Sequence, residues 1–173
     1  MITVLPTRRG PGRLQATAFG LAATVAGLDQ VAKTLARSGL ETAIDLTPFL
    51  ALRLGFNPGV TFGLFADSGP MGRWVLSGVT ILIIGALLAW IWRTRSAMTG
   101  AAASLVVGGA AGNLIDRLRF GAVTDFIDLH WGEAHWPTFN LADAAIVCGV
   151  GLLLLAAREP KAPAASANLK RAS

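Results

Sequence analysis

Long stretches without a charged side chain are the feature that most constrains how this chain can fold. Residues 74–92 and 96–115 contain no charged side chain, and each is close to the ~20 residues that a helix needs to cross the hydrocarbon core of a bilayer. Two further apolar stretches follow the same pattern less closely: 14–28 is shorter, and 136–157 is interrupted by Asp143. Because 53% of the residues are hydrophobic and only 14% are charged, the composition excludes a soluble domain. We predict a membrane protein whose four transmembrane helices cover about 14–36, 71–92, 96–117 and 137–157.

The basic residues lie in segments that would share one side of such a four-helix bundle. They precede the first apolar stretch, separate the second from the third and follow the fourth: Arg8, Arg9, Arg13, Arg93, Arg95, Arg158, Lys161, Lys170 and Arg171. Basic segments next to transmembrane helices usually face the cytoplasm. We therefore predict that both termini are cytoplasmic and that the two long loops face outside. A net charge of +5 could indicate nucleic-acid binding, but this distribution of the basic residues argues against it.

The loops and the ends of the chain differ in composition. The first long loop mixes β-favouring residues with Pro48, Gly55 and the turn Asn57-Pro58-Gly59, which predicts a few short strands on the outer membrane surface. Residues 160–173 are rich in Ala, Ser, Pro and Lys and are predicted to be disordered. We expect a single domain over residues 1–159: an all-α membrane protein, built as a four-transmembrane-helix bundle with a small β-rich extracytoplasmic loop structure.

The third apolar stretch contains small residues at helical spacing. Gly108 and Gly112 are four residues apart, so they would allow a neighbouring helix to approach closely. The alternative is a phosphate-binding loop, but no Gly-Lys-Ser/Thr follows. We therefore predict that these glycines serve helix packing.

Polar and charged residues gather near the outer ends of the predicted helices. Charges at membrane depth are costly, so each one is a functional candidate unless a partner neutralises it. Three groups have helical i, i+3 or i, i+4 spacing, which places the members of each group on one helix face: Asp29 with Lys33, Asn113 with Asp116 and Arg117, and Asn140 with Asp143. The three groups would meet at one level of the membrane.

The numbers of acids and bases at this level do not match. Four aspartates, including Asp125, face only Lys33 and Arg117, so at least one carboxylate has no basic partner. Two carboxylates in a poorly hydrated site cannot both ionise cheaply, and a pair that shares one proton can act as acid and base at once, as in aspartic proteases. A proton relay or transporter and purely structural pairing are the alternatives. The third and fourth stretches carry no ionisable residue in their cytoplasmic halves, which counts against transport.

The second long loop carries a possible metal motif, "HWGEAH", with His130, Glu133 and His135. Its spacing matches neither H-E-x-x-H nor H-x-x-E-H, and a third firm ligand is missing. We therefore predict no metal site and no cofactor. Asp128, nearby, is expected to cap a helix or to lie at the surface. The lone Cys148 is expected to be a small core residue.

Five segments of the chain resemble, in order, the signature blocks of the lipoprotein signal peptidase family, the bacterial signal peptidase II: "DQVAK" from Asp29, "NPGVTFG" from Asn57, "GGAAGNLIDR" from Gly108, "VTDF" from Val123 and "FNLADAAI" from Phe139. This resemblance implies a membrane aspartic endopeptidase that removes signal peptides from diacylglyceryl-modified prolipoproteins by cutting before the lipidated cysteine. It places the enzyme in the bacterial cytoplasmic (inner) membrane, with the active site towards the outer leaflet. The implied partners are the lipidated precursor and membrane lipid, and the chain is expected to be a monomer.

The resemblance also implies roles for individual residues. Asp125 and Asp143 would be the catalytic pair, with the division of labour between them left open. Substrate binding is implied for Asn57, Asn113, Arg117 and Asn140, and a supporting role for Asp29, Lys33, Gly112 and Asp116, of which Asp116 would orient Arg117. The second long loop would act as a mobile cover. Val60 and Thr61 depart from the family pattern, which has small residues there, and this affects the expectation for substrate preference.

Overall fold

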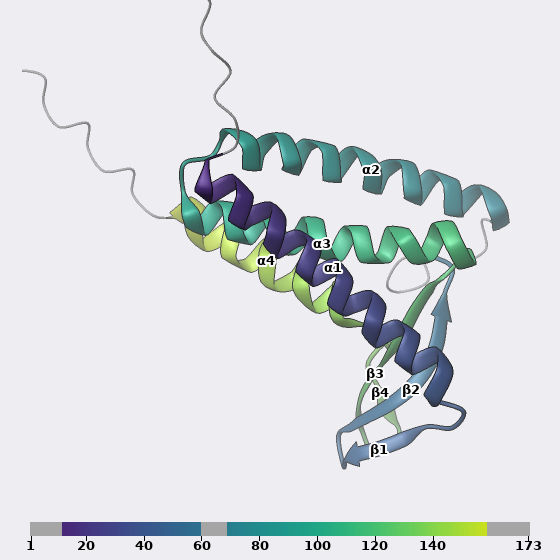
Figure 1. Cartoon of the computed structure of the whole chain (residues 1–173). Helices are drawn as coiled ribbons and strands as arrows, with labels where there is room; N and C mark the ends of the chain where they lie inside the picture. Colours follow the sequence, from purple (N-terminus) through teal and green to yellow (C-terminus); the bar gives the residue numbers. More distant parts are fainter. Residues whose placement is uncertain (1–11, 60–68, 159–173) are drawn as a thin grey trace, which may run out of the picture.

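The computed structural model describes residues 12–59 and 69–158, which form four helices and one small sheet. The helices are α1 (Arg13–Gly39), α2 (Gly69–Arg93), α3 (Ala97–Phe120) and α4 (Leu141–Arg158). In Figure 1 the start of α1, the end of α4 and the connection from α2 to α3 lie at one end of the bundle, and the sheet lies at the other. The predicted tail and the two residues that depart from the family pattern, Val60 and Thr61, lie outside the described residues.

Three of the described helices are long and apolar enough to cross a membrane, namely the segments Met71–Arg93, Ala97–Phe120 and Leu141–Arg158. The protein is thus a mostly helical membrane protein with a small antiparallel sheet. Helix α1 is long enough to be a fourth span but is less apolar, because polar side chains such as Gln15, Asp29 and Lys33 interrupt it. A count of four transmembrane helices is therefore not established by composition and length.

Helix α3 is the centre of the bundle and packs against each of the other three helices. Small side chains allow this close approach: a Cβ at Gly108 would come within 2.6 Å of the carbonyl oxygen of Ala22 in α1, and one at Gly112 would overlap the carboxylate of Asp29. On the side of α4, a Cβ at Gly149 would come within 2.7 Å of the carbonyl oxygen of Ala102. The prediction that Gly108 and Gly112 serve helix packing is confirmed.

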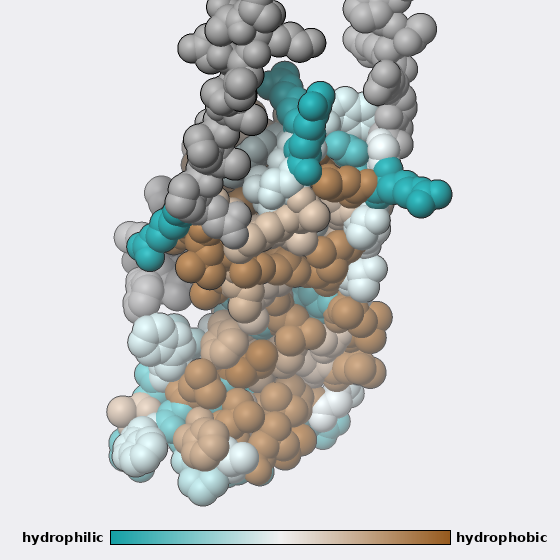
Figure 2. Space-filling model, turned by 90° about the vertical axis from the view of Figure 1, so that its left-hand side faces the viewer, coloured by the Kyte–Doolittle hydropathy of each residue, from teal (hydrophilic) through white to brown (hydrophobic). Residues whose placement is uncertain are grey.

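The outer surface of the helices is strongly apolar. Leu82 on α2 and Val147 on α4 are 74% and 71% exposed, respectively, and they belong to a larger set of exposed aliphatic and aromatic residues on these helices. Figure 2 shows hydrophobic residues in brown across the middle of one face of the molecule. Such a surface suits contact with lipid chains, because leaving it in water would forfeit the hydrophobic free energy of burial.

The sheet is antiparallel and has the strand order β1-β2-β3-β4. Its strands are β1 (Ile44–Thr47), β2 (Leu50–Asn57), β3 (Val123–Trp131) and β4 (Ala134–His135). The predicted strands of the first long loop are confirmed, but half of the sheet comes from the second long loop, where we expected a mobile cover. Strand β3 pairs with β2 and β4, so this loop is an inner part of the sheet and carries Asp125 opposite Gly55.

Candidate active site

The last turns of α3 divide their polar side chains between two sides of the helix. Asp116 points towards α1, whereas Asn113 and Arg117 line a cavity between the helices and the sheet. This follows from helical geometry, since adjacent residues are about 100° apart around the axis. Two neighbouring polar regions result, and they differ in how their charges are balanced.

The first region is a closed ionic cluster between α1 and α3. The Lys33 ammonium lies 2.8 Å from Asp29 Oδ2 and 3.8 Å from Asp116 Oδ2, and all three side chains are fully buried. Arg37 adds a second positive charge, with Nη1 3.4 Å from Asp116 Oδ2. The Thr124 amide donates to Asp116 at 2.9 Å, and Gln30 donates to the other oxygen of this carboxylate at 3.2 Å. Two carboxylates thus face two basic groups, and the cluster carries no net charge.

This cluster changes one expectation and adds residues that the sequence analysis missed. The resemblance implied that Asp116 orients Arg117. Among the described residues, however, the hydrogen bonds of the Asp116 carboxylate go to residues of α1 and β3. Arg37, Gln30 and Thr124 were not predicted to take part. Arg37 follows Lys33 at i+4, and this spacing on α1 would have revealed it.

The second region contains Asp125 and Asp143, which line the same cavity of about 460 Å³. Asn140 lies between them. Its side-chain Nδ2 donates to Asp125 Oδ1 at 2.7 Å, and its backbone N–H donates to Asp143 Oδ2 at 3.2 Å. The Asp143 amide in turn donates to Asn140 Oδ1 at 3.0 Å, a reciprocal arrangement that caps the start of α4. A single buried residue therefore fixes both carboxylates relative to each other.

The two carboxylates of this cavity have no basic partner in contact. Among the residues that the structure describes, no Lys, Arg or His nitrogen lies within 4.0 Å of either carboxylate. Arg117 lines the cavity, but its Nη2 donates to the carbonyl oxygen of Gly59 at 2.9 Å and acts on the two acids only through its field. Two neighbouring acids without a basic group in contact lower the stability of a fold, and such sites are commonly functional.

The environment of Asp125 favours its protonated form. Burial raises the pKa of Asp125, and the negative charge of Asp143 raises it further, to about 6. Hydrogen bonds from Asn140 and Asn57 oppose this rise without cancelling it. Asn57 ends strand β2, and its Oδ1 accepts from the Gly59 amide at 3.0 Å.

Asn113 connects the two regions. Its Oδ1 accepts a hydrogen bond from the Lys33 ammonium at 2.7 Å and one from Asn140 Nδ2 at 3.2 Å. Its Nδ2 donates to Asp143 Oδ1 at 2.8 Å. Because an ammonium can only donate, it fixes the orientation of the Asn113 amide, and the amide group then has to present its N–H to Asp143.

The cavity is polar at one end and apolar along its walls. The polar end comprises Asn57, Asn113, Arg117, Asp125 and Asp143. The apolar walls come from three helices and include Leu76, Ile83, Val106, Ile146 and Val150. A substrate that combines a peptide group with a long apolar portion would match this division.

Comparisons with known proteins identify relatives of this chain. The family model described as "Signal peptidase (SPase) II" matches residues 21–158. The chain is similar to a lipoprotein signal peptidase of Azoarcus sp. (strain BH72), with 44% identity over 79% of each chain, and to one of Rhizorhabdus wittichii, with 44% identity over 84% of this chain and 90% of the relative. A solved bacterial membrane enzyme that is 28% identical superposes with a TM-score of 0.74, covering 85% of this chain and 94% of its own.

Proposed function

This chain belongs to the signal peptidase II family, and on that premise we propose that it is a membrane protease that removes signal peptides from lipid-modified prolipoproteins with Asp125 and Asp143 as its catalytic pair. The observation that carries the residue assignment is their common position in one cavity, joined by Asn140 and without a basic group in contact. The relatives are named as lipoprotein signal peptidases, which supports a prolipoprotein as the substrate.

The mechanism begins with one proton on the pair. We place this proton on Asp125, because burial and the negative charge of Asp143 raise the pKa of Asp125 to about 6. Asp143 accepts N–H groups from Asn113 and Asn140. The Asp143 carboxylate takes a proton from water, whose oxygen attacks the scissile carbonyl carbon, and Asp125 gives its proton to the carbonyl oxygen. The resulting tetrahedral diol collapses as the C–N bond breaks, one diol proton returns to Asp125, and the leaving nitrogen takes the proton held by Asp143.

Lys33 contributes to this chemistry as a positioning residue. It does not touch the cavity acids, but it orients the Asn113 amide that donates to Asp143. Asn57 and Arg117 stand at the polar end of the cavity, where they would bind the peptide backbone of the substrate. The apolar walls would hold the lipid chains and the hydrophobic part of the signal peptide, so the cut falls beside the lipidated cysteine.

The same proposal includes a topology. Helix α1 would be the fourth transmembrane helix, because its charged residues face α3 and are neutralised there rather than exposed to lipid. The start of α1, the end of α4 and the loop between α2 and α3 share one end of the bundle, and we assign this basic end to the cytoplasm. The sheet and the cavity would then face the outer leaflet of the cytoplasmic (inner) membrane. Membrane lipid would surround a monomer.

Purified protein incubated with a diacylglyceryl-modified precursor tests the catalytic pair, with cleavage followed by gel shift. Asp125→Asn and Asp143→Asn should each reduce turnover by at least about 10³-fold, because each removes a group that transfers a proton in the transition state. Asp45→Asn, an exposed carboxylate on β1, is the matched control and should retain wild-type turnover. Near-normal cleavage by either cavity variant would disprove the assignment. A chelator should leave turnover unchanged, because this mechanism uses no metal.

A further inference from the structure

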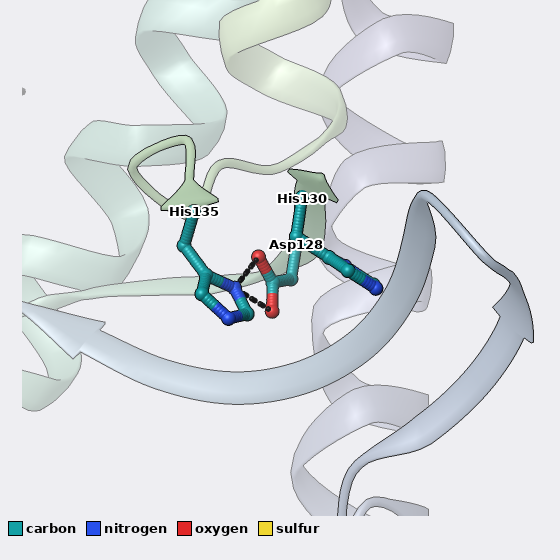
Figure 3. A group of neighbouring side chains, drawn as sticks. All are labelled: Asp128, His130 and His135. Atoms are coloured by element: carbon teal, nitrogen blue, oxygen red, sulfur yellow. Dashed lines mark hydrogen bonds and ion pairs between the residues drawn. The ribbon is translucent and has the colours of Figure 1, made fainter. Parts of the chain in front are cut away.

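The hairpin formed by β3 and β4 carries three side chains of metal-binding type on one face. Asp128 and His130 are two residues apart in β3, so they project from the same side of the strand. His135 in β4 is the direct cross-strand partner of His130. Figure 3 shows the three side chains together, with the carboxylate of Asp128 hydrogen-bonded to the ring of His135. The sequence motif suggested Glu133 as the third group, whereas the structure brings Asp128 to this place.

The three groups lie close together and are partly withdrawn from water. One ligand atom from each lies within 4.8 Å of those of the other two. His135 Nδ1 is 2.9 Å from Asp128 Oδ1, and the two rings stack with centroids 5.1 Å apart. Asp128 is only 1% exposed, in contrast to our expectation of a cap or surface residue, because His135 and Arg53 hold its carboxylate.

His130 supplies an independent sign that a ligand is involved. Its Nδ1 is buried and has no hydrogen-bond partner among the described residues. Leaving such an atom unpaired costs roughly 1–3 kcal/mol, and the buried nitrogens of metal-binding histidines are normally paired with the ion or with an outer partner. Two imidazoles and one carboxylate form a donor set that suits Zn²⁺ and Cu²⁺ and leaves further positions for water.

We propose that Asp128, His130 and His135 form a binding site for a divalent transition metal ion such as Zn²⁺. Ligand atoms around a tetrahedral Zn²⁺ are roughly 3.4 Å apart, so the site closes by a small movement of the rings. The side chain of His135 is 41% exposed and has room for this movement. The ion would fasten β4 to β3.

The metal site is separate from the catalytic cavity. Asp125 and Asp128 are three residues apart in β3, which places their side chains on opposite faces of the strand. Asp128, His130 and His135 do not line the cavity that holds the catalytic pair. The proposal therefore does not depend on the proposed function, and metal binding is not a step of the cleavage reaction.

Arg53 allows a further test, because its replacement should change the metal affinity in a direction that the proposal predicts. Its Nε lies 3.1 Å from Asp128 Oδ2, so its positive charge competes with a metal ion for this carboxylate. The Arg53 side chain is 53% exposed and is free to turn into solvent when an ion binds. Replacing it by Gln removes a repulsive charge beside the ion and should strengthen metal binding.

A Zn²⁺ titration in competition with a chromophoric chelator tests the site directly. It uses the full chain in detergent, without affinity tags and stripped of metal beforehand. We expect one Zn²⁺ per wild-type chain, binding weakened at least about tenfold in His130→Gln and His135→Gln, and tighter binding in Arg53→Gln. Glu133→Gln is the matched control, because this exposed carboxylate lies in the same hairpin outside the group, and it should bind as the wild type does. Electron paramagnetic resonance of bound Cu²⁺ should show coupling to two imidazole nitrogens, and to one in either His variant.

Three outcomes would overturn the proposal. The first is a wild-type chain that binds no Zn²⁺ under these conditions. The second is an unchanged affinity in both His variants. The third is a Glu133→Gln variant that loses affinity as the His variants do, which would assign the third ligand to Glu133. Circular dichroism of each variant shows that the fold is retained, so a loss of binding reports on the site.

Discussion

The closed ionic cluster between α1 and α3 lies next to the cavity with Asp125 and Asp143. The two regions differ in how the charges of their acidic residues are balanced. In the cluster, Asp29 and Asp116 face Lys33 and Arg37, and their charges cancel. In the cavity, two carboxylates accept hydrogen bonds from amide groups and have no basic group in contact among the described residues. Asp29, Asp116 and Asp125 are all buried, so burial alone does not separate the acids of the cluster from those of the cavity.

The difference lies in the balance of charge. A buried acid with a basic partner keeps a fixed ionisation state, which suits a residue that holds two helices together. A buried acid beside another acid has a raised pKa and can exchange a proton near neutral pH, as the raised pKa of Asp125 indicates. Counting basic partners therefore separates the two regions, and this difference is why we propose the cavity as the active site.

Breaking the ionic cluster should have the largest effect on stability. Lys33→Met leaves the buried Asp29 carboxylate without its cation, and we expect the free energy of unfolding to fall by about 3–5 kcal/mol. The measurement is denaturant or thermal unfolding in detergent. The double variant Asp29→Asn/Lys33→Met removes both charges and should recover most of this loss. Equal losses in the single and double variants would mean that packing, not charge, is what the cluster supplies.

The pH dependence of stability should reveal the unbalanced acids. The pKa of Asp125 is about 6 in the folded protein and 3.8 ordinarily, so the folded state holds this proton more tightly. The contribution of this bound proton to the free energy of unfolding is therefore complete below about pH 4 and is lost as the pH rises through about 6. Asp125→Asn should unfold with nearly wild-type free energy at pH 4 and be more stable than the wild type at pH 7.5, by at most about 3 kcal/mol.

Asp45→Asn, with an exposed carboxylate, is the control for that experiment and should differ little from the wild type at either pH. A wild type that is more stable than Asp125→Asn at pH 7.5 would show that Asp125 is stabilised as a carboxylate. The contrast between the two regions would then fail.

The smallest effect is expected at Asn113, which links the two regions. Asn113→Ala removes the N–H donor to Asp143 but leaves the ion pair of Lys33 and Asp29 intact. We expect kcat to fall about 10–100-fold, corresponding to one positioned hydrogen bond, with little change in KM. Single-turnover cleavage of the lipidated precursor measures this, and unchanged turnover would show that the amide does not orient Asp143.

The sequence predicted much of the site because its elements are helical. The i, i+4 spacing of Asp29 and Lys33 correctly placed both residues on one helix face, where the structure shows an ion pair. The turn-rich composition of the first long loop correctly predicted strands. Strand β3 was missed because its partners β2 and β4 approach from elsewhere in the chain, and strand pairing is not visible in one segment alone.

The amino-acid sequence by itself determined that the chain lies in a membrane, because apolar stretches of this length cannot be hidden in a small soluble domain. It also determined that polar residues meet at one level, because helical periodicity fixes the face of each residue. Only the tertiary structure decided which acids are neutralised: it turned Asp116 towards Lys33 and Arg37, joined Asp125 to Asp143 through Asn140, and placed Asp128 beside two histidines. Electrostatic energy depends on distances between side chains that lie far apart in the chain, and these distances exist only in the folded protein.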